Sequence, residues 1–143
     1  MNVYSCVLLA LLLAPAMVQG DDGVLKAGEA HERVTRGEAV LIDIRQPEEW
    51  RQTGLAADAV GISMQHPGGA SGFREAVREA VGGDMDASIV LICRTGNRSS
   101  QLVSALRDWG YSNVHHVAEG MAGSGYGPGW LKSGLPVEDC QVC

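Results

Sequence analysis

The chain has 143 residues, of which 45% are hydrophobic and 20% charged, and its formal net charge is −6. No run rich in Lys and Arg offsets this acidic balance, which argues against a protein that binds nucleic acid or an anionic membrane. The aliphatic content argues against a disordered chain, and the length suits one domain with its own core.

An uncharged apolar segment opens the chain. Residues 1–20 carry no charged side chain, and Cys6–Ala14 is continuously apolar. This block is too short to cross a bilayer, and small residues stand where signal peptidase would cleave after Ala16 or Gly20. We expect residues 1–20 to be a signal peptide and the mature protein to be exported, periplasmic or secreted, with no membrane attachment after cleavage. A buried N-terminal helix is the alternative.

Helices and strands are expected to alternate along the mature chain. The predicted elements are a helix over Leu25–Arg36, a strand over Ala39–Ile44, a helix from Pro47 ended by Gly54, a weak strand over Ala59–Ile62, a Gly-rich loop over His66–Gly72, a helix over Phe73–Val81, a strand over Ser88–Ile92, a helix over Ser99–Trp109 and a strand over Val114–Val117. The strands are continuously apolar, which predicts an α/β fold whose parallel sheet is covered on both faces.

The segment after the strand predicted over Ser88–Ile92 carries the candidate site. Ligands of parallel sheets bind beyond the carboxyl ends of the strands. There the chain reads Cys93-Arg94-Thr95-Gly96-Asn97-Arg98, and a helix follows at once. Backbone N–H groups of such a loop can converge on one point and favour a thiolate there. Two arginines in an acidic protein indicate an anionic substrate. A buried structural cysteine is the alternative.

Four motifs, in order along the chain, resemble those of the rhodanese (sulfurtransferase) family. They are the six-residue loop Cys93–Arg98, the Asp-x-Arg segment Leu41–Arg45 with Pro47–Trp50, the Gly-Tyr-x-x-Val segment Gly110–Val114, and a C-terminal signature of Glu119–Met121, Trp130 and Gly134–Val137. The resemblance implies one rhodanese domain over residues 21–137, with a five-stranded parallel sheet flanked by helices on both faces. Residues 138–143 form a tail beyond it.

The resemblance also implies covalent sulfur transfer without a cofactor or metal. Cys93 would attack the outer sulfur of a donor such as thiosulfate, sulfite would leave, and a thiol, a thioredoxin-like protein or cyanide would take the sulfur from the Cys93 persulfide. The implied substrate-binding residues are Arg94, Thr95, Gly96, Asn97 and Arg98, with the two arginines assigned to the sulfonate of the donor. Asp43 and Arg45 are assigned to structural support. A non-enzymatic persulfide carrier or redox-binding module is the competing class.

The length and composition of the loop restrict the choice of reaction and of sulfur donor. Four residues lie between Cys93 and Arg98, whereas the related phosphatases have a Cys-x5-Arg loop that is one residue longer. The mercaptopyruvate-specific branch favours a small uncharged residue after the cysteine, and here that residue is Arg94. Thiosulfate is therefore the expected donor.

Three features depart from the family pattern. The usual Gly-His pair is Gly54-Leu55, so no histidine is expected there, and His66 lies either near the site or on a solvated loop. The insert Ala122–Gly129 either flanks the mouth of the site or decorates the surface.

Cysteines in the tail are the third departure. After removal of the leader, Cys93, Cys140 and Cys143 remain, and the simplest partition is a tail pair and a lone Cys93. The tail pair is either a small local disulfide, a redox pair that accepts sulfur or exchanges with a partner, or half of a metal site, for which only His115-His116 offer further ligands.

Overall fold

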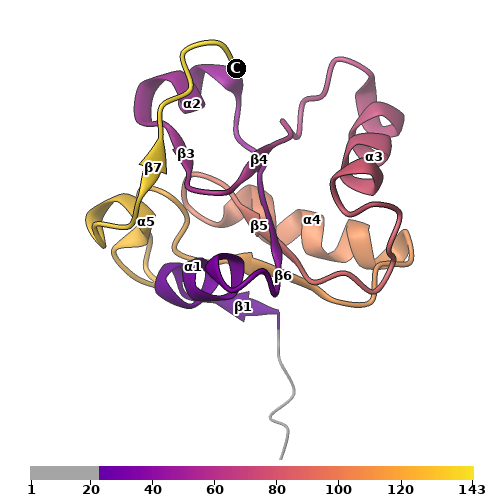
Figure 1. Ribbon diagram of the computed structural model, residues 1–143, viewed down its shortest axis with the longest axis horizontal. Helices are drawn as coiled ribbons and strands as arrows, with labels where there is room; N and C mark the ends of the chain where they lie inside the picture. The colour runs from indigo at the N-terminus through magenta and orange to yellow at the C-terminus, as the bar shows by residue number, and fades with distance from the viewer. Residues whose placement is uncertain (1–22) are drawn as a thin grey trace, which may run out of the picture.

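The computed structural model describes residues 23–143 (Figure 1). The signal peptide expected over residues 1–20 lies outside these described residues. Between residues 23 and 143, no helix combines the length and the apolar character needed to cross a membrane.

Five parallel strands form the central sheet, in the order β1-β6-β5-β2-β4. Their bounds are β1 Val24–Leu25, β2 Val40–Asp43, β4 Val60–Gly61, β5 Ile89–Ile92 and β6 Val114–Val117. The central strand β5 pairs with β2 on one side and β6 on the other, and all four of its residues are buried. A strand covered on both faces can be apolar at every position, and this explains the sequence Ile-Val-Leu-Ile. The α/β class and the five-stranded parallel sheet are as predicted.

Helices cover both faces of this sheet. One face packs against α3 (Gly69–Ala80) and α4 (Asn97–Asp108), which contribute Phe73, Val77, Leu102, Val103 and Leu106. The other face packs against α1 (Ala27–Thr35) and the short α5 (Gly129–Lys132), which contribute Ala27, Ala30, Val34 and Trp130. The remaining helix, α2 (Pro47–Thr53), follows β2 and begins at a proline with a capping box between Gln46 and Glu49.

A second, two-stranded sheet ties the C-terminal tail to the body. In it β3 (Leu55–Ala56) pairs in antiparallel fashion with β7 (Val137–Glu138). Because β3 directly follows α2, this pairing brings the tail alongside the end of α2, as Figure 1 shows.

Two sequence predictions about local structure were wrong. The helix predicted from Leu25 begins at Ala27, because Val24 and Leu25 pair with β6 as an edge strand. The loop predicted over His66–Gly72 gives way to α3 at Gly69, two turns before its buried anchor Val77. Glycine and serine in the first turn hide this helix from a propensity argument, and burial of the apolar side chains that follow overrides their low propensity.

Candidate active site

The loop after β5 encloses a buried cysteine sulfur. Cys93 directly follows Ile92 and is 1% exposed, and the backbone N–H of Gly96 donates to Cys93 Sγ at 3.2 Å. Gly96 has a left-handed φ of 88°, which turns the chain from the loop into α4. A Cβ at Gly96 would collide with the carbonyl oxygen of Ala118, so both conformation and space require glycine here.

The segment after β6 forms the other wall of this loop. Met121 N–H donates to Cys93 O, and Ala122 N–H donates to Arg94 O, both at 2.9 Å. Gly120 has a positive φ and lies against the backbone of Arg94, where a side chain would not fit. The insert Ala122–Gly129 therefore begins on the active-site loop itself.

Arg98 makes a bidentate ion pair with Glu49 of α2. Its two terminal nitrogens donate to the two carboxylate oxygens, each at 2.8 Å, and the side chains are 32% and 22% exposed. The hydrogen bonds from Arg98 hold the pKa of Glu49 below its ordinary value, and those to Glu49 raise the pKa of Arg98. The positive charge of Arg98 is thus offset by a carboxylate 49 residues away in the sequence.

Arg45 fastens α2 to the sheet. It is 2% exposed and donates to the carboxylate of Asp43, which is wholly buried, at 2.7–3.0 Å. Its remaining N–H groups donate to Thr53 Oγ1 at 2.7 Å and to Gly54 O at 2.8 Å. Asp43 and Arg45 therefore hold in place the helix that presents Glu49 to the active-site loop.

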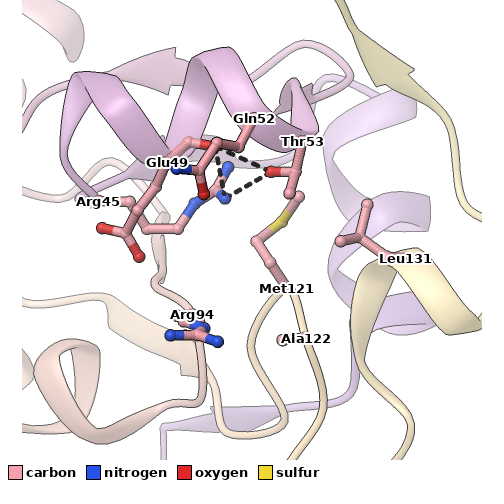
Figure 2. A pocket seen from close by; sticks show the side chains of 8 residues that line it. All are labelled: Arg45, Glu49, Gln52, Thr53, Arg94, Met121, Ala122 and Leu131. Atoms are coloured by element: carbon pink, nitrogen blue, oxygen red, sulfur yellow. Dashed lines mark hydrogen bonds between the residues drawn. The ribbon is translucent and has the colours of Figure 1, made fainter.

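A polar pocket of about 210 Å³ lies between α2 and the loop (Figure 2). Its lining consists of Arg45, Glu49, Gln52, Thr53, Arg94, Met121, Ala122 and Leu131. Arg94 is exposed and stands on the loop side of this pocket, across from the helix that carries Glu49 (Figure 2). Cys93 does not line the pocket and stays beneath the loop.

Thr95 and Asn97 lie elsewhere. With Gly96 and His116 they line a separate pocket of about 160 Å³, which the exposed Tyr126 of the insert also borders. Consecutive residues of the loop thus serve two pockets, one lined by Arg94 and the other by its neighbours. The family resemblance instead assigns all five residues of Arg94–Arg98 to binding of one substrate.

Two polar side chains next to the sulfur were missed by the sequence analysis. Cys93 Sγ–H donates to Ser99 Oγ at 3.5 Å, and Ser99 Oγ lies 3.1 Å from His116 Nδ1. Ser99 is wholly buried and His116 is 8% exposed; burial lowers the pKa of His116. A serine at the first turn of the helix after the loop was the available signal. In the sequence His116 stands out only beside His115, as a further ligand for a metal site.

The other candidates are placed away from the sulfur. His66 Nδ1 accepts the N–H of Gly68 at 3.0 Å, which forms a local turn before α3. Cys140 and Cys143 are joined as a disulfide, and Cys93 is the free cysteine among residues 23–143. This is the predicted division of the cysteines into a tail pair and a lone Cys93. Within the same residues, no group of three or more His, Cys, Asp or Glu is placed to hold a metal.

Comparison with known proteins identifies related chains. A family model described as "Rhodanese-like domain" matches residues 26–124. The uncharacterized protein RP600 of Rickettsia prowazekii (strain Madrid E) is 26% identical over 108 residues, which span 72% of this chain and 85% of that protein.

Solved structures share the fold. The polysulfide-sulfur transferase homodimer of Wolinella succinogenes superposes with a TM-score of 0.62 at 22% identity, covering 83% of this chain and 80% of that one. Thiosulfate sulfurtransferase from Pseudomonas aeruginosa gives a TM-score of 0.62 at 22% identity, over 80% of this chain and 20% of that one. A rhodanese-related protein from Thermoplasma volcanium gives 0.58 at 24% identity, over 82% and 98%.

Proposed function

The chain belongs to the rhodanese-like domain family, and from that premise we propose that it is a sulfurtransferase that moves a sulfane sulfur from thiosulfate to a thiol. The observation that carries the proposal is the Cys93 sulfur within a loop whose Gly96 N–H already points at it. A backbone donor aimed at sulfur stabilises a thiolate and, after transfer, a persulfide anion. Two similarly folded proteins, the thiosulfate sulfurtransferase of Pseudomonas aeruginosa and the polysulfide-sulfur transferase of Wolinella succinogenes, support the reaction class.

Sulfur moves in two half-reactions. The Cys93 thiolate attacks the outer sulfur of thiosulfate; an S–S bond forms at Cys93, the sulfur–sulfur bond within the donor breaks, and sulfite leaves with its electron pair. An acceptor thiolate or cyanide then attacks the outer sulfur of the persulfide, and the Cys93 thiolate departs. The covalent intermediate predicts ping-pong kinetics.

Arg94 is the cation that suits the donor. It is exposed at the pocket between α2 and the loop, and no carboxylate among residues 23–143 forms an ion pair with it. Arg98 has its charge matched by Glu49, so we assign it to holding α2 against the loop. This division changes the expectation from the sequence, which gave both arginines to the sulfonate.

Mass spectrometry after incubation with thiosulfate tests the proposal. We expect Cys93 to gain the mass of one sulfur atom, and cyanide to remove it. Cys93→Ser should not load, whereas the double variant Cys140→Ser/Cys143→Ser should load normally if the tail pair is a local disulfide. A Cys93→Ser protein that still turned over thiosulfate would overturn the assignment. Loss of loading in the tail variant would instead favour a redox role for Cys140 and Cys143.

A persulfide carrier without turnover is the second candidate, and the 1% exposure of Cys93 is the observation that favours it. A buried sulfur is out of reach of free acceptors while the loop covers it, so a docked partner that opens the loop would be the preferred acceptor. The two candidates differ in kinetics. Repeated turnover with thiosulfate and a small thiol supports the enzyme, whereas one loading event that only a dithiol protein of the thioredoxin class discharges supports the carrier.

We also propose that the protein acts outside the cytoplasm. The apolar residues 1–20 and the Cys140–Cys143 disulfide support this, since disulfides persist in oxidising compartments. Cell fractionation with mass spectrometry of the N-terminus tests it. A mature N-terminus at residue 17 or 21 is expected, and an intact Met1 in the cytoplasmic fraction would refute it.

A further inference from the structure

Two buried side chains extend the hydrogen bonds of the Cys93 sulfur. Cys93 Sγ–H donates to Ser99 Oγ at 3.5 Å, and the Ser99 hydroxyl lies 3.1 Å from His116 Nδ1. The same hydroxyl lies 3.1 Å from a second acceptor, Gly96 O. A hydroxyl and an imidazole in a core need hydrogen-bond partners. Here the partners connect the nucleophile to a titratable group.

We propose that Ser99 and His116 form a proton route that takes the Cys93 proton out of the core, with His116 as the positioning residue that receives it. The proposal rests on the proposed function, because a sulfur nucleophile must be a thiolate. It concerns the resting enzyme. In the second half-reaction Cys93 departs as a thiolate already, so that step needs no proton removed from it.

The proton balance involves three groups. The S–H bond of Cys93 breaks and its electron pair stays on sulfur. Ser99 Oγ takes this proton and gives its own to His116 Nδ1, which leaves a thiolate, an intact hydroxyl and an imidazolium. The imidazolium then loses a proton to water.

His116 is the point at which this route meets solvent. It lines the pocket of about 160 Å³ behind the loop, and it is 8% exposed. Burial lowers the pKa of His116, so the ring is neutral at neutral pH and one nitrogen is free to accept a proton. The pocket supplies the water that completes the transfer, on a different side of the loop from Arg94.

Few other titratable groups face His116. The insert contributes Tyr126, and α4 contributes Ser99 with Cys93 behind it, while the edge strand β1 contributes the apolar Val24. No Lys, Arg, Asp or Glu of residues 23–143 lines this pocket. Lys26, Glu29 and Glu119 line the neighbouring pocket, which Tyr126 also borders.

His115 is a matched control within the same strand. It is 6% exposed, similar to His116, but successive side chains of a strand point to opposite faces. Its Nε2 lies 2.6 Å from Asn113 Oδ1, away from Cys93. Ser104, an exposed serine of α4, is the corresponding control for Ser99.

The experiment compares thiolate formation among variants of the full chain in a Cys6→Ala background. Ultraviolet absorbance of the thiolate is titrated against pH, and the Cys93→Ser titration is subtracted. Because the proton ends in water, His116 changes the rate at which Cys93 loses its proton and leaves the equilibrium in place, so we expect the titration midpoint of His116→Asn to match the parent. At neutral pH the rate at which thiosulfate loads His116→Asn and Ser99→Ala should fall roughly tenfold, less than a full general-base effect because the Gly96 N–H still stabilises the thiolate. Ser99→Thr should restore the loading rate, and His115→Asn and Ser104→Ala should match the parent.

Persulfide discharge separates a proton route from a structural role. His116→Asn loaded at alkaline pH should release its sulfur to cyanide at the parental rate. Loading of a folded His116→Asn protein at the parental rate at neutral pH would overturn the proposal, as would a loading defect of equal size at every pH. If the parent titrates as expected but never gains sulfur from any sulfane donor, the proposed function fails and the proton route stands.

Discussion

Replacing Glu49 by glutamine isolates the ion pair that joins α2 to the active-site loop. Glutamine keeps the side-chain oxygen that accepts the Gln46 N–H in the capping box, so the start of α2 is preserved. What is lost is the charge opposite Arg98, together with one of two hydrogen bonds of 2.8 Å. The change therefore reports on the pair and leaves the helix cap in place.

The magnitude follows from the partial burial of the pair. A buried hydrogen bond to a charged group contributes about 1.5–3 kcal/mol, and an exposed ion pair about 0.2–1 kcal/mol. With side chains 22% and 32% exposed, the Glu49–Arg98 pair lies between these limits. We expect Glu49→Gln to lower the free energy of unfolding by about 1.5 kcal/mol at neutral pH.

The contribution of Glu49 to the free energy of unfolding depends on pH, and the direction of its pKa shift fixes the sign of that dependence. Folding lowers the pKa of Glu49, so the ionised carboxylate favours the folded state. Its contribution is complete above the ordinary value of 4.5 and is lost as the pH falls through the lowered pKa of the folded state. The difference between Glu49→Gln and the parent should accordingly shrink toward zero in strong acid.

Urea unfolding at neutral and acid pH measures both effects. Glu48→Gln is the matched control, because Glu48 pairs with Arg51 on the exposed side of the same helix and should contribute little. Equal stability of the Glu49→Gln and Glu48→Gln proteins at neutral pH would refute the reasoning. So would a Glu49→Gln difference that persists unchanged in acid.

Three further predictions concern the loop and its support. Gly96→Ala should lower the free energy of unfolding by roughly 2–3 kcal/mol and abolish sulfur loading, since the left-handed φ alone costs about 1–2 kcal/mol and the added Cβ meets a carbonyl. The control is Gly28→Ala, in open space on α1, which should raise the free energy of unfolding by up to about 1 kcal/mol in the same urea assay. Asp43→Asn should cost about 3–5 kcal/mol, because it leaves the buried Arg45 charge without its carboxylate, and a loss under about 1 kcal/mol by urea unfolding would contradict this. Arg94→Ala should raise the KM for thiosulfate roughly tenfold while the thiolate titration of Cys93 stays in place, and steady-state kinetics with an unchanged KM would remove Arg94 from donor binding.

Long apolar strands and proline-initiated or glycine-ended helices could be predicted from the sequence, because each has a local cause. The apolar strand predicted over Ser88–Ile92 is present at Ile89–Ile92, and the helix starting at Pro47 has the predicted bounds. Three of the four two-residue strands, β1, β3 and β7, were not predicted, because they are too short to show any periodicity and only their pairing with distant strands defines them. The same holds for the tail, whose position beside α2 depends on a pairing between Leu55–Ala56 and Val137–Glu138.

The residues of the candidate site could likewise be predicted from the sequence only in part. The loop sequence identifies Cys93 and the need for Gly96, since strand, turn and helix follow one another within a few residues. It does not distinguish Arg94 from Arg98, because the partner of Arg98 is Glu49, in another helix. Nor does it distinguish His116 from His115, whose side chains differ only in the face of β6 to which they point. Charge pairing and facing direction are tertiary properties, and they decide which residues act.

The arrangement around the loop assigns different tasks to its two sides. The pocket beside α2 presents the exposed Arg94 guanidinium, which suits an anionic donor. The pocket on the other side presents His116, which connects through Ser99 to the sulfur. An anion bound close to a thiol opposes its ionisation, because two negative charges then share one site. With the acceptor of the proton on the far side, Cys93 can lose its proton before the donor arrives, and that proton need not cross the surface that binds the anion.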